Sequence, residues 1–181
     1  MSKIAFIFPG QGAQKTGMGK DFYEQSQRAA EIYDAASKRL KEEMEIDIRT
    51  LCFDENDKLD QTAYTQAALV TTCLAMARTL EEKGVRADVT AGLSLGEYCA
   101  IAVAGGMSDL DAVWAVRKRG VLMEEAVPTG VGAMAAVLGL SAEQIEKVTE
   151  EIKGVTVANY NCPGQVVITC LLYTSPSPRD C

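Results

Sequence analysis

Apolar and polar positions follow two different patterns along the chain, which predicts two structural parts. In the first part, a short apolar run ends at Pro9 and Gly10 and predicts a buried strand that enters a tight loop. A long segment rich in Ala, Leu and Thr then continues without a breaker to Gly84 and predicts a largely buried helix, and Ser108 is expected to cap a later helix. In order along the chain, the elements expected in the first part are a strand over residues 4–8, a helix over 21–40, a polar break over 54–61, a helix over 64–80, a strand over 88–91 and a helix over 95–104.

The second part begins near Pro128, where the elements become shorter. Ser141 with Gln144 fits a capping box at the start of a helix in this part. We therefore predict residues 1–127 as part of a large α/β lobe and residues 128–169 as the start of a small lobe, whose β-α-β-β order suggests a split β-α-β layer. The elements expected in the small lobe are a strand over 132–138, a helix over 141–151, a strand over 155–158, a turn over 161–164 and a strand over 165–169.

The last segment, residues 170–181, fits neither lobe. It reads CLLYTSPSPRDC, in which prolines alternate with serines directly after an expected strand. It also resembles a translated sequencing adapter. We expect this segment to lie outside the fold, with a genuine disordered tail as the alternative.

Composition argues against several classes of function. The 181 residues are 48% hydrophobic and 24% charged, which is typical of a globular domain that buries its own core. The net charge of -7 disfavours nucleic-acid binding, because neutralising phosphates needs a dense field of Lys and Arg. We see no signal peptide and no membrane span, and the six cysteines without a CxxC pair favour neither a metal site nor disulfides, so we expect a cytoplasmic protein.

Histidine is absent from the sequence. Without an imidazole, the chain cannot form a Ser-His or Cys-His pair from its own side chains, and it has no unperturbed side chain that titrates near neutral pH. Any acid-base chemistry here is therefore either unusual or depends on residues that this sequence does not contain.

Gly92-Leu93-Ser94-Leu95-Gly96 matches the G-x-S-x-G pattern of a nucleophile elbow and lies between an expected strand and an expected helix, as that motif requires. The glycines let the strand and the helix approach the serine closely. Ser94 would present its hydroxyl at the helix N-terminus, where the backbone N–H of Leu95 and the helix dipole suit an oxyanion. The alternative is an ordinary N-cap serine in a glycine-rich turn.

A second glycine-rich loop, GQGAQ at residues 10–14, follows the first strand. It does not fit a phosphate-binding loop, because Lys15 stands where G-x-G-x-x-G needs its third glycine and Met18 stands where a P-loop needs lysine. Its backbone N–H groups could instead supply the second half of an oxyanion hole. The motif also fits a simple tight turn.

Five separated motifs occur in order and without obvious gaps between Ser2 and Thr169. They are FPGQGAQ at residues 8–14, TQAAL at 65–69, GLSLGEY at 92–98, KRGVLMEEAVP at 118–128 and NYNCPGQVVIT at 159–169. On these motifs the chain resembles the malonyl-CoA:acyl-carrier-protein transacylases of type II fatty acid synthesis. The resemblance implies an α/β fold, with a hydrolase-like large lobe around a mostly parallel sheet and a small ferredoxin-like lobe, both incomplete in this chain.

The resemblance also implies a role for each matching residue. Ser94 would take a malonyl group from malonyl-CoA as an ester and pass it to the phosphopantetheine thiol of acyl carrier protein, in a ping-pong scheme without a cofactor. The backbone N–H groups of Gln11 and Leu95 would form the oxyanion hole. Arg119 would bind the free malonyl carboxylate, for which a planar guanidinium is better suited than Lys. Further pocket-lining residues would be Gln66, Asn159 and Asn161.

Helical spacing supports Arg119 only in part. Arg119 shares a stripe with apolar residues, but Arg117 also lies among apolar neighbours, so spacing by itself does not decide which arginine points inward. The family register selects Arg119. The resemblance further implies a monomer and an acidic carrier protein as partner, for which Lys118 with Arg117 is the candidate basic patch.

The family's catalytic histidine lies downstream of the last motif and has no counterpart in this sequence. Leu93 occupies a position where the family often has His, but that position is not the base. We therefore interpret the chain as an N-terminal fragment that lacks its general base and is inactive by itself.

Two other functions stay open. G-x-S-x-G is also the signature of serine esterases of the α/β-hydrolase type, but an esterase should carry an HGGG-type loop and no carboxylate-binding arginine, whereas GQGAQ and Arg119 stand here. A non-catalytic module that binds acyl-CoA or acyl carrier protein would explain the absence of histidine, although such a module should complete its domain.

Overall fold

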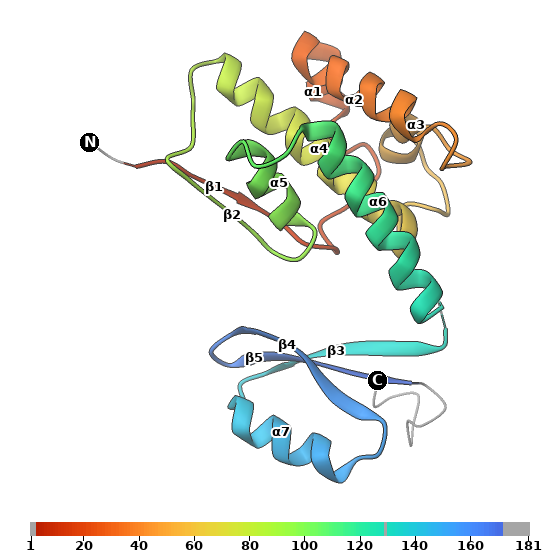
Figure 1. Cartoon of the computed structure of the whole chain (residues 1–181), viewed down its shortest axis with the longest axis vertical. Coiled ribbons are helices and arrows are strands. Elements are labelled where there is room, and N and C mark those ends of the chain that lie inside the picture. Colours follow the sequence, from red (N-terminus) through yellow and green to blue (C-terminus); the bar gives the residue numbers. More distant parts are fainter. Residues whose placement is uncertain (1–2, 129, 172–181) are drawn as a thin grey trace. The chain divides into compact units, whose positions relative to one another are not determined.

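The computed structural model describes residues 3–128 and 130–171, and the chain divides into two compact units, residues 1–124 and residues 125–181 (Figure 1). Both units combine helices with a small sheet, which confirms the α/β class. Across the described residues, no helix has both the length and the apolar character needed to cross a bilayer.

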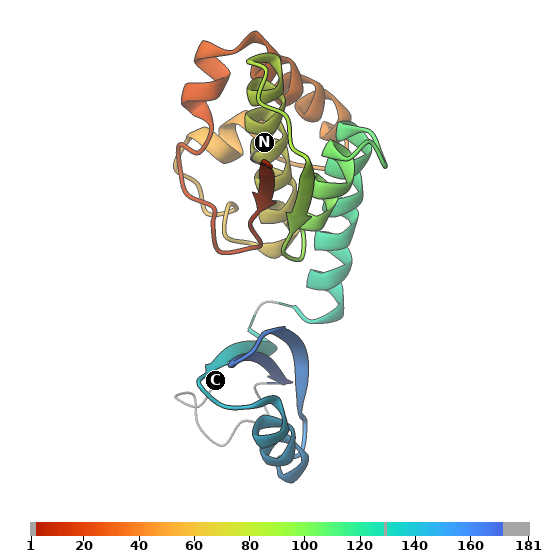
Figure 2. The same ribbon diagram turned by 90° about the vertical axis from the view of Figure 1, so that its left-hand side faces the viewer.

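The first unit combines a two-stranded parallel sheet with helices. Strands β1 (Ala5–Phe8) and β2 (Val89–Gly92) pair in parallel and lie side by side (Figure 2). The long connection that parallel strands need contains four helices. The helices of this unit are α1 (Lys20–Gln25), α2 (Gln27–Leu40), α3 (Ile48–Phe53), α4 (Thr62–Glu82), α5 (Gly96–Val103) and α6 (Asp109–Ala126).

Helix α4 is the most deeply buried element of the first unit. Every residue from Thr65 to Thr72 is buried, which confirms the largely buried helix expected from the Ala-, Leu- and Thr-rich sequence. Helix α2 packs against α4 through one apolar stripe that includes Ile32 and Tyr33, and the Tyr33 hydroxyl forms a 2.7 Å hydrogen bond with the Thr72 hydroxyl. This core supports the sheet and the helices that carry the site.

Two predictions for this unit need correction. The single helix expected over residues 21–40 is two helices, because Ser26 has extended backbone angles, ends α1 through its backbone N–H and caps α2 with its hydroxyl. The Ser26 hydroxyl also bonds to the Thr79 hydroxyl on α4 at 2.9 Å. Helix α3 was not predicted, although Asp47 caps its first turn. The expected cap of α6 is confirmed, since the Asp111 backbone N–H donates to the Ser108 hydroxyl.

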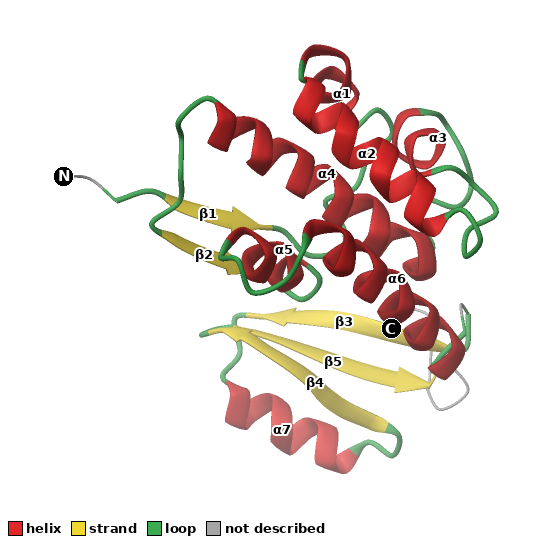
Figure 3. Cartoon of the chain, turned by 45° about the horizontal axis from the view of Figure 1, so that its top comes forward, coloured by secondary structure: helices red, strands yellow, loops and turns green. Residues whose placement is uncertain are grey.

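The second unit is a three-stranded antiparallel sheet with one helix (Figure 3). The central strand β5 lies between β3 and β4, so the β3-α7-β4 connection is a split β-α-β unit. Ser141 and Gln144 form the predicted capping box. The elements of this unit are β3 (Gly132–Leu138), α7 (Ala142–Glu151), β4 (Val155–Cys162) and β5 (Gln165–Leu171).

Two strands of the second unit are longer than predicted. Strand β4 extends to Cys162, with irregular pairing after Val157 and after Tyr160, so that only Pro163 and Gly164 form the turn. Strand β5 extends to residue 171, two residues into the segment that we expected to lie outside the fold. Residues 172–181, the rest of that segment, lie outside the described residues.

One face of the β1–β2 sheet is apolar and open. Phe8 is buried in the core at 5% exposure, whereas the alternating positions Ile7 and Val89 are 71% and 55% exposed. Ile4, just before β1, is 41% exposed. Among the described residues, the outer edges of β1 and β2 have no strand partner, and an open apolar face beside such edges favours association between chains.

We expect the folded chain to bind a hydrophobic dye and to associate reversibly, because Ile7 and Val89 face outward. Replacing both with Thr should reduce dye fluorescence and association while leaving the melting temperature nearly unchanged. As a control, Ile32→Ala removes a buried side chain and should lower the free energy of unfolding by about 2–5 kcal/mol. A cooperative melting transition of a monomer that binds no dye would contradict this expectation.

Candidate active site

Ser94 lies at a sharp turn between β2 and α5. It is the one non-glycine residue among those described with a positive φ, at 54°. A left-handed conformation costs an L-residue roughly 1–2 kcal/mol, so the surrounding structure must enforce it. The turn leaves the Ser94 side chain exposed at the start of α5, which is the elbow geometry that G-x-S-x-G predicts.

The two glycines of the motif are required by close backbone contacts. A Cβ on Gly92 would lie 2.1 Å from the carbonyl carbon and oxygen of Gly96. A Cβ on Gly96 would lie 2.5 Å from the Phe8 carbonyl oxygen and 2.6 Å from that of Pro9. Because these neighbours are backbone atoms, they cannot rotate away. The elbow therefore depends on the absence of side chains at both positions.

Arg119 connects Ser94 to the interior of the first unit. From α6, its Nη2 donates to the Ser94 Oγ at 2.9 Å and its Nη1 donates to the Gln66 Oε1 at 2.7 Å. Gln66 is fully buried on α4, and its Nε2 contacts the Met123 Sδ at 3.3 Å. Three residues predicted to share the site, Ser94, Arg119 and Gln66, thus lie in direct contact, although 53 and 25 positions separate Arg119 from the other two.

Among the described residues, no carboxylate pairs with the charge of Arg119. Its two hydrogen-bond partners are an amide oxygen and a hydroxyl, and no ion pair to it occurs within residues 3–128 and 130–171. The side chain is half-buried. A half-buried guanidinium with neutral partners attracts an anion, and its planar fork matches a carboxylate. This environment is compatible with the carboxylate-binding role of Arg119, which remains a prediction.

Arg117 has a different environment and a structural role. It is 7% exposed, and its Nη1 and Nη2 donate to the carbonyl oxygens of Ala63 and Glu43 at 2.6 and 2.7 Å. Its guanidinium also lies 4.8 Å from the centre of the Tyr64 ring. Arg117 therefore cannot contribute to an exposed basic patch, which corrects that part of the prediction. Lys118 is exposed and pairs with Glu43 at 3.0 Å.

The loop after β1 runs beside the elbow. The Leu93 backbone N–H donates to the Phe8 carbonyl at 3.0 Å, and a Cβ on Gly10 would lie 3.2 Å from the Leu93 carbonyl oxygen. Leu95 is the N-cap residue of α5, where backbone N–H groups point out of the helix end. The Gln11 side chain donates to the Thr62 hydroxyl at 3.1 Å, an anchor that the sequence did not predict. The oxyanion-hole role of Gln11 and Leu95 remains a prediction.

Asn159 and Asn161 lie on β4 in the second unit, and both are exposed. The Asn161 Nδ2 donates to the Gln165 Oε1 at 3.0 Å on the neighbouring strand. Their predicted place in the pocket of Ser94 remains a prediction.

Cys99 and Cys52 are poor competitors of Ser94 as nucleophiles. Contact with the Cys73 thiol and burial on α5 raise the pKa of the Cys99 thiol, and burial raises the pKa of Cys52 to about 12. Since only the thiolate is strongly nucleophilic, both remain inert at neutral pH. In the described part of the chain, no three potential metal ligands among His, Cys, Asp and Glu lie together.

Comparisons with known proteins agree on one family. The acyl transferase domain pattern matches residues 5–171. The malonyl CoA-acyl carrier protein transacylase of Bacillus subtilis is 50% identical over 174 residues, which are 93% of this chain and 54% of that protein. The chain thus spans about half the length of the curated relatives it matches.

Solved structures give the same result. The crystal structure of a malonyl CoA-acyl carrier protein transacylase from Clostridium perfringens has a TM-score of 0.85 and 41% identity, covering 96% of this chain and 55% of that one. A malonyl-transacylase solved in complex with its type II PKS acyl-carrier protein has a TM-score of 0.85 and 36% identity, covering 96% of this chain and 56% of that one.

The close contacts at the elbow predict the effect of a single methyl group. Gly96→Ala should lower the free energy of unfolding by about 3 kcal/mol, because its Cβ meets fixed backbone atoms. Gly84→Ala is the matched control: Gly84 has a φ of +84° but open space around it, so only the left-handed backbone should cost, at about 1 kcal/mol. Urea unfolding of both variants measures the difference, and equal losses would contradict the close-packed elbow.

Proposed function

The chain belongs to the acyl transferase domain family, and from that premise we propose that its site transfers a malonyl group from malonyl-CoA to the phosphopantetheine thiol of an acyl carrier protein. The observation that carries the proposal is the Arg119–Ser94 contact, in which a guanidinium with no ion pair to the described residues lies 2.9 Å from an exposed serine hydroxyl at a strained elbow. A malonyl thioester offers an acyl carbon for the hydroxyl and a free carboxylate for the cation.

The reaction proceeds by two attacks on a carbonyl carbon. First, the Ser94 Oγ attacks the malonyl thioester, and the tetrahedral oxyanion lies against the N–H groups of Leu95 and Gln11. The carbon–sulfur bond then breaks, and the coenzyme A thiol leaves with the proton taken from Ser94. In the second half, the carrier thiol attacks the ester, its proton returns to Ser94, and the malonyl thioester of the carrier leaves.

Arg119 selects the acyl group in this scheme. Its fork binds the malonyl carboxylate, an interaction that an acetyl group cannot make. Gln66 positions the fork from the buried side, since its own oxygen accepts from Nη1 and its place on α4 is fixed by packing.

The proposed reaction needs a general base that these 181 residues do not supply as imidazole, because they contain no histidine. In the structure, Ser94 accepts a hydrogen bond from Arg119, which leaves its own proton free for such a base. The guanidinium also stabilises the negative charge that develops on Oγ when that proton leaves.

The esterase alternative is less favoured, because hydrolysis of a simple ester gives no use for an unpaired cation beside the serine. A carrier protein as partner is supported by the related malonyl-transacylase that was solved with its acyl-carrier protein. We further propose the cytoplasm as the compartment, which the free thiols of Cys52, Cys73, Cys99 and Cys162 support.

Intact-protein mass spectrometry after incubation with malonyl-CoA tests the nucleophile. The full chain should form little or no malonyl adduct, since it lacks an imidazole base. A chimaera in which residues 5–171 replace the matching part of the Bacillus subtilis relative should form the adduct, and Ser94→Ala should abolish it. An adduct on the chain itself would refute the claim that acylation of Ser94 needs a histidine base. If neither protein forms an adduct, a non-catalytic binding module is favoured.

Kinetics of the same chimaera tests the carboxylate site. Arg119→Ala should lower kcat/KM for malonyl-CoA relative to acetyl-CoA by roughly 10- to 150-fold, the equivalent of one charged hydrogen-bonding partner at about 1.5–3 kcal/mol. Arg86→Ala removes an exposed cation from the loop between α4 and β2 and should leave the ratio unchanged. An unaltered malonyl preference in Arg119→Ala would refute the role of Arg119.

A further inference from the structure

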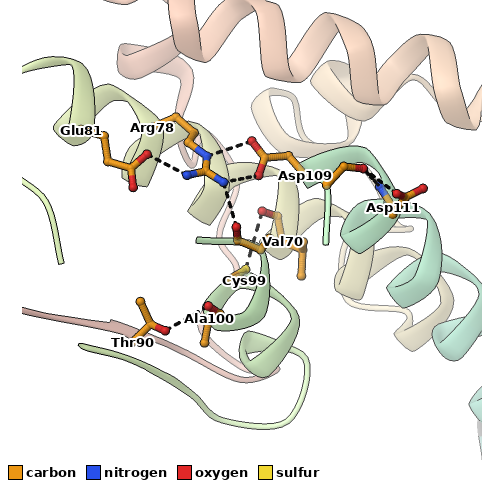
Figure 4. Close-up of polar contacts among 10 residues, drawn as sticks. Val70, Arg78, Glu81, Thr90, Cys99, Ala100, Asp109 and Asp111 are labelled. Carbon is orange, nitrogen blue, oxygen red and sulfur yellow. Dashed lines mark hydrogen bonds and ion pairs between the residues drawn. The ribbon is translucent and has the colours of Figure 1, made fainter. Parts of the chain in front are cut away.

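Arg78 joins three helices at the end of the first unit away from Ser94. From α4, its Nε and Nη2 donate to the two carboxylate oxygens of Asp109 at 3.0 and 2.7 Å, as Figure 4 shows. The same Nη2 donates to the Ala102 carbonyl at 3.0 Å, and Nη1 donates to Glu81 at 2.7 Å. We call Arg78, Asp109 and the Ala102 carbonyl the helix clamp.

The position of the clamp suits its charges. Ala102 belongs to the last turn of α5, where free carbonyls favour a cation, and Asp109 opens α6, where free N–H groups favour an anion. The side chains of Arg78 and Asp109 are only 19% and 15% exposed, so water screens their attraction less than it screens a surface pair. The clamp therefore holds the end of α5 against the start of α6 across their short connection.

Helix α5 packs against the core with two bulky side chains, Tyr98 and Val103, which are only partly buried. Its buried residues are small, namely Gly96, Cys99, Ala100 and Ala102. Polar contacts also hold this helix. The Thr90 hydroxyl of β2 donates to the Ala100 carbonyl at 3.0 Å, and the Cys99 thiol lies 3.9 Å from the Val70 carbonyl (Figure 4). Of these contacts, the clamp is the one that carries charge and the one that also contacts α6.

The clamp and the site lie on the same three elements. Gln66 is on α4, Ser94 immediately precedes α5, and Arg119 is on α6. Along α4, the twelve positions from Gln66 to Arg78 span about 18 Å. Because an α-helix is rigid over this length, a shift of α4 at the clamp also moves Gln66 at the site. The three elements thus meet twice, once around Arg119 and once around Arg78.

From this arrangement we infer that Arg78 is a positioning residue for the proposed transfer: the clamp fixes α5 and α6 so that the Ser94 hydroxyl meets the Arg119 guanidinium. The inference rests on the proposed function for its substrate. Malonyl transfer needs a fixed distance and orientation between Ser94 and Arg119, because the thioester of one malonyl group must reach Ser94 while its carboxylate binds Arg119. Acetyl transfer needs the elbow but does not depend on the placement of Arg119 relative to Ser94, because an acetyl group has no free carboxylate.

Selectivity therefore separates positioning from plain stabilisation. In the chimaera, Arg78→Met removes the charge and the fork but keeps an unbranched side chain, and it should lower the malonyl-to-acetyl ratio of kcat/KM by roughly 2- to 30-fold. Arg78→Lys restores the charge without the fork and should recover part of that ratio. Arg49→Met is the matched control, since Arg49 pairs with Asp34 and Asp47 away from the clamp and the site helices, and it should leave the ratio unchanged.

A second measurement is independent of malonyl transfer. In the full chain, the side-chain ¹⁵N signals of Arg119 report its hydrogen bond to Ser94, and Ser94→Ala identifies the change that follows loss of that bond. Arg78→Met should produce a similar change, whereas Arg49→Met should not. If the unsubstituted chimaera shows no malonyl preference, the proposed function fails, while the Arg119 signals still decide the positioning role.

The inference would be overturned by a purely structural result. That result is an Arg78→Met protein that melts at a lower temperature but keeps both the malonyl-to-acetyl ratio and the Arg119 signals of the unsubstituted protein. A double-variant comparison with Asp109→Asn adds a check, because the two losses in selectivity should not add if both residues act through one clamp.

Discussion

The close approach of backbone to backbone at the elbow is the constraint on which the rest of the first unit depends. The start of α5 lies against the end of β1 so tightly that a methyl group at Gly96 would overlap two carbonyl oxygens. This contact forces Ser94 into a left-handed conformation and turns its hydroxyl outward. The strain is local, but the cost is met by packing of the whole unit, in particular by the buried helix α4.

Three arginines of the first unit, Arg78, Arg117 and Arg119, differ in the groups that they contact. Two half-buried or buried arginines hold backbone and side-chain oxygens in place, Arg78 through a carboxylate and Arg117 through carbonyls. Arg119 differs because its partners are neutral and one of them is the candidate nucleophile. This difference distinguishes Arg119, as a candidate binding cation, from the two structural arginines. A partly buried guanidinium without an ion pair among the described residues favours binding of an anion.

Several features of the fold could be predicted because they depend on neighbours within a few residues. The G-x-S-x-G elbow, the Ser141 capping box and the buried character of α4 follow from side-chain size, hydrogen-bonding groups and apolar content along a short stretch. The break at Ser26 was missed even though its cap is local, because helical periodicity continues through it and the Ser26 hydroxyl also bonds to Thr79 on α4.

The α/β class, the elbow with Ser94 and, through the resemblance, the family could all be read from the sequence, because they depend on the identity and spacing of residues along the chain. The family register selected Arg119, but helical spacing left Arg117 open, and the contact of Arg119 with Ser94 is seen only in the three-dimensional structure. Arg117 and Arg119 lie two positions apart on one helix with similar neighbours in sequence, and their different contacts come from Ala63, Gln66 and Ser94, which are distant along the chain. Helix packing brings those partners together, and no local pattern encodes it.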